Sequence, residues 1–422
     1  MKLKLSVLGV MLFAILPVHA GELTPWTLTE SVRRAVFMSP ELRAAEAEIE
    51  ARVGVLEQSD AWPNPTMELR TDEKLGLEDA RGGYNLNQLS ITQSIPLQRL
   101  SHQRRASEAA LESARSAHAY QSLMLEAKTA QAFHTFQLAA GRTHLADERV
   151  SFVEDMQYGL GQLGKDRLVR YLSPLEKARL EIMRASAHQA ADKAEGELNE
   201  ALVQFRTLLD LPPNEKIETT HLIPAEPPTE LSKLFMQLDV HPAIQALRFQ
   251  RDARRDGVEV AKAGRFADPT LTIFHELDYL GGSRRGYTGL MLGIQLPLWT
   301  QNDGDVARAR GEAVKADALI EEQQRDLSSH QQHSHMHLGH LIEQAQYYRA
   351  KLLQPAFELL ELTRKGYKSG EQNGLELVDS SNTYFDAQAR YLELLHEAWL
   401  TAADLRLASG ISLLNNSIGF EP

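Results

Sequence analysis

Five histidines within residues 330–340 form the densest group of potential metal ligands in the sequence: His330, His333, His335, His337 and His340. If this segment is helical, His333 and His337 lie one turn apart, and that spacing can chelate zinc or copper. Neutral histidines at the same spacing also pack well at a seam between helices. The sequence therefore leaves two interpretations open, a metal site formed by His330, His333, His337 and His340, or a structural stripe.

Catalytic motifs do not accompany these histidines. The His-Glu-x-x-His pattern of zinc hydrolases is absent from the sequence, as are a nucleophile elbow and a phosphate-binding loop. We therefore predict that the protein is not an enzyme and that it uses no cofactor.

Acidic residues in the C-terminal part could act on cations without catalysis. Glu376 and Asp379 are three residues apart, so they share one face of a helix. Glu176 stands 200 residues before Glu376, in a similar helical stretch. Around a narrow lumen such carboxylates would attract cations, whereas on a solvated outer face they would only aid solubility.

Two stretches in which apolar and polar residues alternate predict β-hairpins. The strands are expected at about residues 65–73, 84–95, 270–280 and 287–296. Strands of about ten residues with one apolar face suit a membrane, although a hairpin over a soluble core has the same pattern. In the first hairpin the alternation changes phase after Leu86, as a β-bulge allows.

The chain is a tandem duplication, because its motifs recur about 200 residues apart. Pro65-Thr66 reappears as Pro269-Thr270, and Leu175-Glu176 as Leu375-Glu376. Each copy follows the order helix, strand, strand, long helix, long helix. The first copy covers residues 21–210, a linker 211–231, and the second copy 232–422. The long helices are expected at about 100–138, 143–210, 303–348 and 356–407, with turns at Ala139–Arg142 and Leu352–Pro355.

The N-terminus and the composition indicate an exported protein. Residues 1–20 have the pattern of a secretory signal peptide that is cleaved after Ala20. The chain contains no cysteine, so we expect neither disulfides nor a lipid anchor on an N-terminal cysteine. A net charge of −12 argues against nucleic acid as a partner. Beyond the signal no stretch is apolar enough for a membrane helix, so any membrane crossing would use strands.

Four strands cannot close a membrane barrel, because the smallest single-chain barrels have about eight. Three protomers would supply twelve. If the strands enter a membrane, the predicted fold is therefore mainly α with a small β part: a duplicated repeat whose long coiled-coil helices form a helical barrel and whose four strands join a trimeric, twelve-stranded membrane β-barrel.

The segment from Gly366 to Asp379 carries the most specific pattern, reading Gly-Tyr-Lys-Ser-Gly-Glu-Gln-Asn-Gly-Leu-Glu-Leu-Val-Asp. It is followed by Tyr384 and by Tyr391-Leu-Glu-Leu. In these residues the chain resembles the TolC family of outer-membrane efflux factors, across essentially all of its mature length. The chain length and the segment 346–355 are most similar to the CzcC/CusC heavy-metal branch.

This resemblance implies a homotrimeric, passive exit duct that works with a periplasmic adaptor protein and an inner-membrane pump of the RND type. It implies that Tyr367 helps to latch a closed periplasmic tip and that Glu376 and Asp379, with Glu176 in the first copy, form constrictions. Gln372 stands where the best-known member of the family has a latching arginine. The two predicted turns would contact the adaptor. Residues 74–83 and 281–286 would be extracellular loops of a barrel whose strands lie in outer-membrane lipid.

Other functions fit parts of the pattern. The same channel could serve drugs, small organic molecules or type I secretion instead of metals. A periplasmic coiled-coil scaffold or metal-binding protein, with its hairpins in water, is the alternative of a different class.

Overall fold

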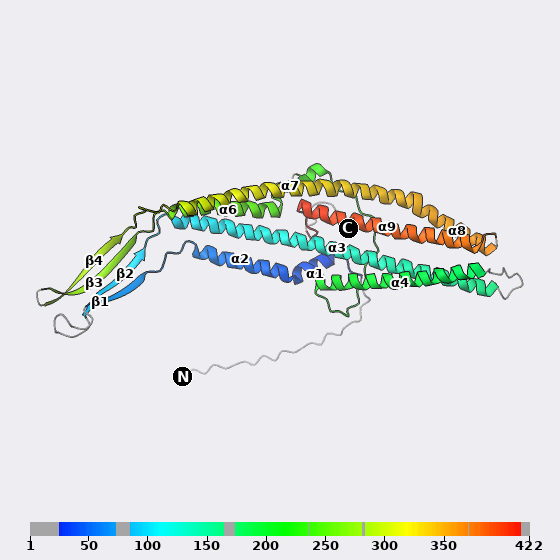
Figure 1. The fold of residues 1–422 in the computed structure, drawn as a ribbon, viewed down its shortest axis with the longest axis horizontal. Helices are drawn as coiled ribbons and strands as arrows, with labels where there is room; N and C mark the ends of the chain where they lie inside the picture. Colours follow the sequence, from blue (N-terminus) through cyan, green and yellow to red (C-terminus); the bar gives the residue numbers. More distant parts are fainter. Residues whose placement is uncertain are drawn as a thin grey trace, which may run out of the picture.

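The computed structural model describes residues 25–72, 85–163, 174–235, 237–280, 283–369 and 371–414. A four-stranded sheet lies at one end of an elongated molecule, and long helices run from it to the opposite end (Figure 1). No helix in these ranges has an apolar stretch long enough to cross a membrane.

The two halves of the chain repeat one plan, which confirms the predicted duplication. The first half contains α1 (Leu28–Met38), α2 (Pro40–Gln58), β1 (Thr66–Asp72), β2 (Asn85–Ser94), α3 (Arg99–Leu163) and α4 (Pro174–Leu209). The second contains α5 (Leu231–Phe235), the 3-10 turn η1 (Leu238–Val240), α6 (Pro242–Ala263), β3 (Thr270–Leu280), β4 (Ser283–Gly293), α7 (Asp303–Tyr348), η2 (Arg349–Leu353), α8 (Gln354–Ser369) and α9 (Gly374–Ser409). In each half a helix leads to the sheet and a longer one leads away from it (Figure 1).

Equivalent capping residues start the helix that leads to the sheet in each half. The Ser39 hydroxyl accepts the N–H of Leu42 at 3.2 Å, and His241 Nδ1 accepts the N–H of Ala243 at 3.2 Å. A proline follows each cap, in the first helical position, where its missing N–H costs nothing. His241 also lies 3.0 Å from the Leu407 carbonyl oxygen, which ties the start of α6 to the end of α9.

The helix α3 is continuous through residues 139–142, so the turn predicted there is wrong. One helix of 65 residues covers the first predicted helix, the predicted turn and the first part of the second predicted helix, and at 1.5 Å per residue it is about 97 Å long. Gly141 lies inside this helix, and a Cβ atom on it would make an ordinary van der Waals contact of 3.4 Å with Leu392 Cδ1 of α9. The connection to α4 is residues 164–173, outside the described part.

The turn predicted at Leu352–Pro355 is also wrong. Residues Arg349–Leu353 form the π-helical segment η2, and the helix continues as α8 to Ser369. Pro355 has no N–H to donate within a helix, and the wider π-helical turn before it accommodates the missing bond. Both predicted turns therefore lie along helices, and they lose their basis as adaptor contacts.

The sheet is antiparallel in the order β1-β2-β3-β4, so pairing between β2 and β3 joins the two copies. Arg70 pairs with Gln88 but Thr71 pairs with Leu86, which confirms the predicted bulge in β2. The strand β4 begins at Ser283, earlier than predicted, because Gly286 pairs with Leu277 within the ladder. A Cβ atom on Gly286 would lie 3.1 Å from Leu277 Cδ2, so this glycine also serves a close approach.

Apolar side chains of all four strands share one face of the sheet and are exposed. The register places Ile91 beside Ile273 on this face, and Ile273 beside Leu290. Exposed members are Met67 (68%), Leu69 (63%), Ile91 (49%), Ile273 (52%), Leu290 (72%) and Leu292 (64%). Trp299, just beyond β4, is 91% exposed. A continuous apolar face of this kind is typical of a surface that meets something other than water.

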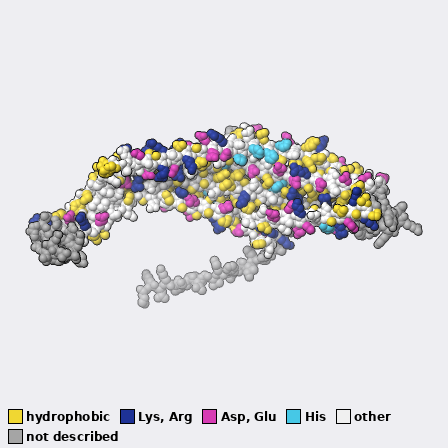
Figure 2. Space-filling view, viewed as in Figure 1, with side chains coloured by type: hydrophobic (Ala, Val, Ile, Leu, Met, Phe, Trp, Pro, Cys, Tyr) yellow, Lys and Arg dark blue, Asp and Glu magenta, His cyan; other side chains and the backbone are white. Residues whose placement is uncertain are grey.

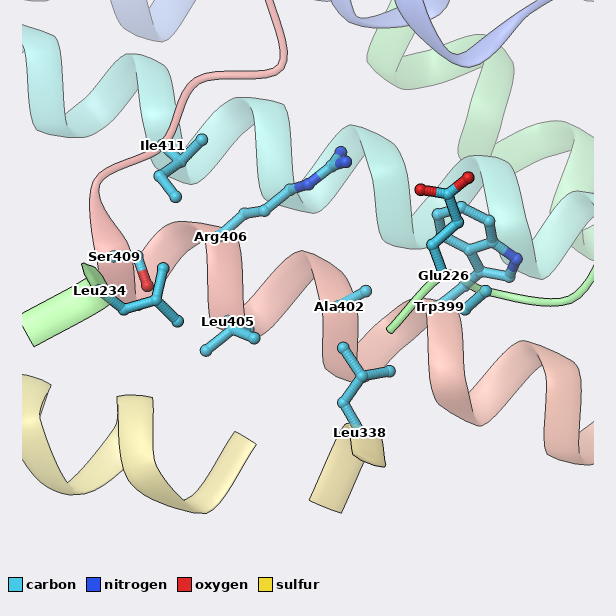
Figure 3. A pocket seen from close by; sticks show the side chains of 10 residues that line it. Glu226, Leu234, Leu338, Trp399, Ala402, Leu405, Arg406, Ser409 and Ile411 are labelled. Atoms are coloured by element: carbon cyan, nitrogen blue, oxygen red, sulfur yellow. The ribbon is translucent and has the colours of Figure 1, made fainter. Parts of the chain in front are cut away.

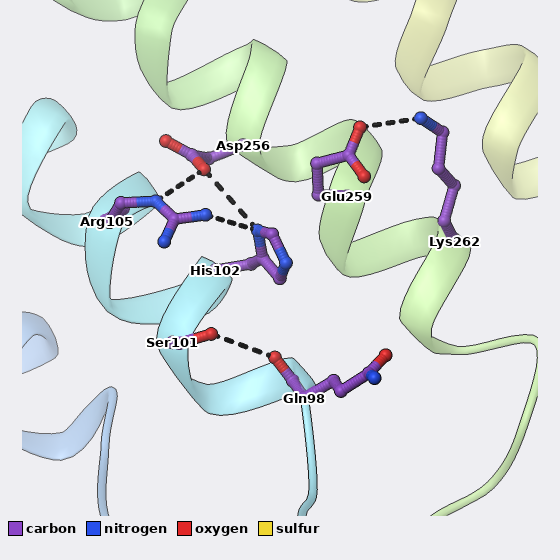
Figure 4. A network of polar contacts seen from close by, with 7 residues as sticks. All are labelled: Gln98, Ser101, His102, Arg105, Asp256, Glu259 and Lys262. Carbon is purple, nitrogen blue, oxygen red and sulfur yellow. Dashed lines mark hydrogen bonds and ion pairs between the residues drawn. The ribbon is translucent and has the colours of Figure 1, made fainter.

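Polar contacts fix the helices where they leave the sheet (Figure 4). Arg105 of α3 donates to Asp256 of α6 at 3.0 Å, and His102 Nδ1 lies 3.7 Å from the same carboxylate. Next to the strands, Arg99 donates to Asp268 at 3.0 Å. These contacts orient α3, which follows β2, and α6, which precedes β3, side by side next to the sheet.

The main apolar core lies midway along the molecule. Phe205 of α4 is fully buried, and its ring centroid lies 6.0 Å from that of Phe133 and 5.5 Å from that of Phe136, both in α3. Trp399 of α9 packs in a second cluster and donates its indole N–H to the Ile223 carbonyl at 2.8 Å. The linker between the copies is thereby held against the helices.

Buried polar groups lie beside this core. The cavity between Trp399, Arg406 and Glu226 has a volume of about 20 Å³, room for one water molecule (Figure 3). Burial lowers the pKa of Arg406, and the charge of Glu226 opposes that shift. Glu126 is buried and accepts the Leu413 N–H at 2.7 Å, which fixes the chain after α9, and burial raises its pKa. We find no room here for a ligand of substrate size.

The continuity of α3 generates a prediction at Gly141. Gly141→Ala should stabilise the protein by up to about 1 kcal/mol, because alanine favours a helix and its methyl group fits beside Leu392. Gly141→Leu should destabilise it by about 1–3 kcal/mol through overpacking. Thermal unfolding of the detergent-solubilised protein measures both. A destabilised alanine variant would contradict a helix at this position.

The buried His134 generates a pH prediction. Burial lowers its pKa from 6.5 to about 4, against the opposing hydrogen bond with Gln137. Between these values the unfolded chain binds the proton more readily than the folded one, so stability falls as the pH drops from 6.5 toward 4, by at most about 3 kcal/mol.

His134→Asn should flatten this decline, measured as the thermal midpoint across pH 4–7. The decline should not vanish, because burial also lowers the pKa values of His241 and His396. His144→Asn, at an exposed histidine, is the matched control and should follow the wild type. Equal slopes for His134→Asn and the control would refute the assignment.

Candidate gate at the tip of the helices

Four of the predicted gate residues come together at the end of the molecule opposite the sheet. Tyr367 lies in the last turn of α8, Gln372 in the connection, and Glu376 and Asp379 in the first turns of α9 (Figure 1). Glu176 lies in the first turn of α4, and its side chain is outside the described part of the structure. The end of the molecule opposite the sheet, called the tip below, is therefore the candidate gate.

The backbone at Gly366 builds the turn between α8 and α9. Its carbonyl oxygen accepts the N–H of Glu371 at 2.9 Å, the N–H of Gln372 at 3.0 Å and the Ser369 hydroxyl at 3.0 Å. A Cβ atom on Gly366 would lie 2.5 Å from Gln372 Cγ, so only glycine lets the Gln372 side chain fold back this closely. The turn is thus a compact unit, and Gln372 is part of its packing.

Tyr367 packs among the helices instead of projecting from the tip. It is half-buried against an apolar cluster that contains Met156 of α3, Leu360 of α8 and Leu377 of α9. Its Cε2 atom also lies 3.7 Å from the position of a Cβ on Gly374. Tyr367 therefore connects both helices of its own hairpin to α3.

Glu376 and Asp379, which the sequence placed on one face, have different surroundings. Asn373 caps α9: its Oδ1 accepts the Glu376 N–H at 2.9 Å, and the Glu376 carboxylate accepts the Asn373 N–H at 3.2 Å. This reciprocal pair is a capping box, and it places the carboxylate at the positive end of the helix dipole. Asp379 is exposed and forms no ion pair within the described part of the chain. Asp379 is thus better placed than Glu376 to offer charge to a lumen.

Two arginines of α3 tie the hairpins together above the tip. Arg149 donates to Asn382 at 2.7 Å, and its guanidinium lies 5.9 Å from the centre of the Phe385 ring, both in α9. Arg142 donates to Glu197 of α4 at 3.0 Å and to Glu393 of α9 at 2.8 Å.

Arg390 and Arg142 both hydrogen-bond the Glu393 carboxylate, and these bonds lower its pKa. The contacts of Arg142 and Arg149 with α9, called the clamps below, were not predicted from the sequence. Arg142 was assigned to a turn, and the α9 partners of both arginines lie more than 200 residues away, so no local pattern indicates them. Any opening of the tip that separates α9 from α3 must break these contacts.

The histidine stripe lies on α7, away from the tip. His335 Nε2 is 3.0 Å from the Thr229 carbonyl oxygen, so this histidine fixes the linker. The ring centroids of His333 and His337 are 5.8 Å apart, and His337 Nε2 lies 3.5 Å from a Glu397 oxygen of α9. His330 and His340 are exposed on the same helix. Among the described residues no three metal-ligating side chains already converge on one point.

The difference between the two acids predicts separate effects at the tip. Glu376→Ala removes half of the capping box and should cost about 1 kcal/mol, so amide exchange in the first turn of α9 should become about fivefold faster. Asp379→Asn should leave that exchange unchanged, because its side chain is not part of the cap. Hydrogen exchange of residues 371–380 measures both.

In planar bilayers Asp379→Asn should lower the preference for cations over anions, read from the reversal potential in a salt gradient. Glu376→Gln is the control, because glutamine preserves the capping geometry while removing the charge. An unchanged reversal potential for Asp379→Asn would exclude a lumenal role for that carboxylate.

Comparisons with known proteins agree with this architecture. A model of the outer membrane efflux protein family matches residues 236–411. The cobalt-zinc-cadmium resistance protein CzcC of Cupriavidus metallidurans is 23% identical over 400 residues, which cover 93% of this chain and 92% of CzcC.

Two solved structures illustrate the shared fold. CusC matches with a TM-score of 0.75 at 17% identity, over 92% of this chain and 93% of CusC. The outer membrane protein VceC of Vibrio cholerae matches with a TM-score of 0.75 at 16% identity, over 91% of this chain and 96% of VceC. The second half of the chain, residues 236–411, thus matches the outer membrane efflux protein family, and the whole chain is similar to CzcC.

Proposed function

We propose that the protein is the outer-membrane channel of a tripartite efflux system of the RND type, a passive exit duct whose cargo is heavy-metal cations. One observation carries this proposal. An exposed apolar sheet lies at one end of the helices, of which α3 is about 97 Å long, and a compact turn with candidate gate residues lies at the other end. Such a chain can reach from a membrane to a distant partner.

A trimer follows from the edges of the sheet. The strands β1 and β4 each have one neighbour, so the sheet ends in two rows of unpaired backbone groups. Lipid does not tolerate such edges, whereas pairing β4 of one protomer with β1 of the next satisfies them. Three protomers would close a barrel of twelve strands with the apolar face outward and an aqueous lumen inside.

The cargo is inferred from a relative and from charge. CzcC, which aligns over nearly the full length of both chains, is named as a cobalt-zinc-cadmium resistance protein. In a threefold channel Asp379 would recur three times around the axis, and such a ring favours cations. A ring of carboxylates gives less support to drugs or small organic molecules as the cargo.

The partners would meet the tip. We infer that a periplasmic adaptor protein contacts the tip, at the end of α3, the start of α4 and the start of α9, and that an inner-membrane pump delivers the cargo. The clamps at Arg142 and Arg149 would keep the tip closed until the adaptor separates α9 from α3. The protein itself would bind and conduct, and would perform no chemistry.

A strain that lacks the gene tests the cargo. Zinc, cobalt or cadmium should inhibit its growth at concentrations several-fold lower than those that inhibit the parent strain, whereas its tolerance of hydrophobic drugs should be unchanged. The wild-type gene should restore growth. Hypersensitivity to drugs alone would remove the metal assignment and leave the duct. Recovery of the protein as a monomer in the soluble periplasmic fraction would overturn the duct itself.

A further inference from the structure

The seam between α7 and α9 pairs histidines with acids at a regular spacing. The two helices run in opposite directions and pack together midway along the molecule (Figure 1). His337 faces Glu397, and seven residues away on each helix His330 interacts electrostatically with Asp404. In the space-filling view, histidines gather over α7 (Figure 2). The seam therefore joins imidazole and carboxylate groups at the surface.

The contact between His337 and Glu397 has the spacing of two ligands more than that of an ion pair. Its 3.5 Å distance exceeds the 2.7–2.9 Å of a charge-assisted hydrogen bond. Two donor atoms on one tetrahedral zinc ion, each bound at about 2.0–2.2 Å, are about 3.4 Å apart. A zinc ion therefore fits between these two atoms with little movement of either helix.

His333 supplies a third ligand from the next turn of α7. Its ring centroid is 5.8 Å from that of His337, with 32° between the ring planes. Two imidazoles on one tetrahedral zinc ion have centroids about 5 Å apart, so a small rotation of the exposed His333 side chain brings its nitrogen into place. Ser334 and Leu338, which follow the two histidines, are buried, so the pair lies at the edge of the packed face of the helix.

We propose that His333, His337 and Glu397 form a binding site for a divalent transition-metal cation, Zn²⁺ by preference, with water as the fourth ligand. Two imidazoles and one carboxylate are a ligand set that suits zinc. The site is accessible, because the side chains of His337 and Glu397 are 38% and 48% exposed. A cation held there would join α7 to α9. The proposal does not depend on the duct, since the site is complete within one protomer.

Neighbouring histidines supply the contrast. His335 is committed to the Thr229 carbonyl, on another side of the helix. His144 of α3 lies 3.3 Å from Glu148, so it also forms a histidine–carboxylate pair. His144 has no second histidine three or four residues away in the sequence, so it lacks the second imidazole. It is a matched control for the same kind of pair without a chelate.

Zinc titration of the full-length, tag-free protein in detergent tests the site. In competition with a chromogenic zinc chelator, the wild type should bind one Zn²⁺ per protomer with micromolar or tighter affinity. His333→Gln and His337→Gln should each weaken binding at least tenfold, and Glu397→Gln about tenfold. His144→Gln should bind as the wild type does. Affinity should fall as the pH is lowered, because protons compete with zinc for the imidazole nitrogens.

A second measurement separates a chelate from scattered surface binding. Co²⁺ in the wild type should give the intense visible absorption of a tetrahedral site, and the His333→Gln/His337→Gln double variant should lose it while retaining the wild-type thermal midpoint without metal. Equal Zn²⁺ stoichiometry and affinity in the double variant, or no binding below millimolar Zn²⁺, would overturn the proposal. Either result would leave the channel function untouched.

Discussion

Backbone pairing between β2 and β3 is the interaction on which the rest of the structure depends. It brings the two copies into one sheet, with Ile91 beside Ile273 on the apolar face and Thr92 beside Thr272 on the polar face. The Thr92 and Thr272 hydroxyls are 2.8 Å apart, a direct cross-strand hydrogen bond. Because only a few residues separate each strand from its helix, this pairing also fixes where α3 and α6 can run. Their ion pair at Arg105 and Asp256 then continues the alignment into the helical part.

The same pairing explains why the duplication is structural and not only a sequence echo. One copy alone supplies a two-stranded hairpin, which is marginal in stability, and helices that bury little along their length. Joined through the sheet, the copies cover each other: α3 packs on α6, α4 and α9, and the core around Phe205 and Trp399 closes midway. A chain without cysteine is held together by this mutual coverage.

The sequence predicted those elements whose residues show a local hydrophobic period, and it failed where tertiary contacts determine whether a helix continues. Alternation located the strands, and the phase change after Leu86 located the bulge. Gly141 and Pro355 suggested turns because glycine and proline weaken an isolated helix. In the structure Gly141 lies against Leu392 of α9, and the π-helical turn η2 before Pro355 accommodates its missing N–H. Packing and local geometry therefore stabilise helices that glycine and proline alone do not favour.

The candidate gate shows the same division. A shared face for Glu376 and Asp379 follows from their spacing, but their different roles do not, because the capping box depends on where α9 begins. The capping residue Asn373 directly follows the turn that Gly366 closes. The turn therefore determines that the Glu376 carboxylate caps α9, whereas the Asp379 carboxylate takes no part in the cap. Partners of Arg142 and Arg149 lie on another helix, and no local period reports them.

The two copies share a topology but are not mechanically equivalent. In the first, α3 descends from the sheet to the tip as one uninterrupted helix, whereas in the second the descent passes through α7, η2 and α8. At η2 the regular hydrogen-bond pattern is interrupted, and bending a helix costs least where that pattern is already broken. The Arg142 and Arg149 clamps hold α9 against the stiffer α3. The first copy therefore presents an unbroken helix to α9, whereas the descending helix of the second copy is interrupted at η2.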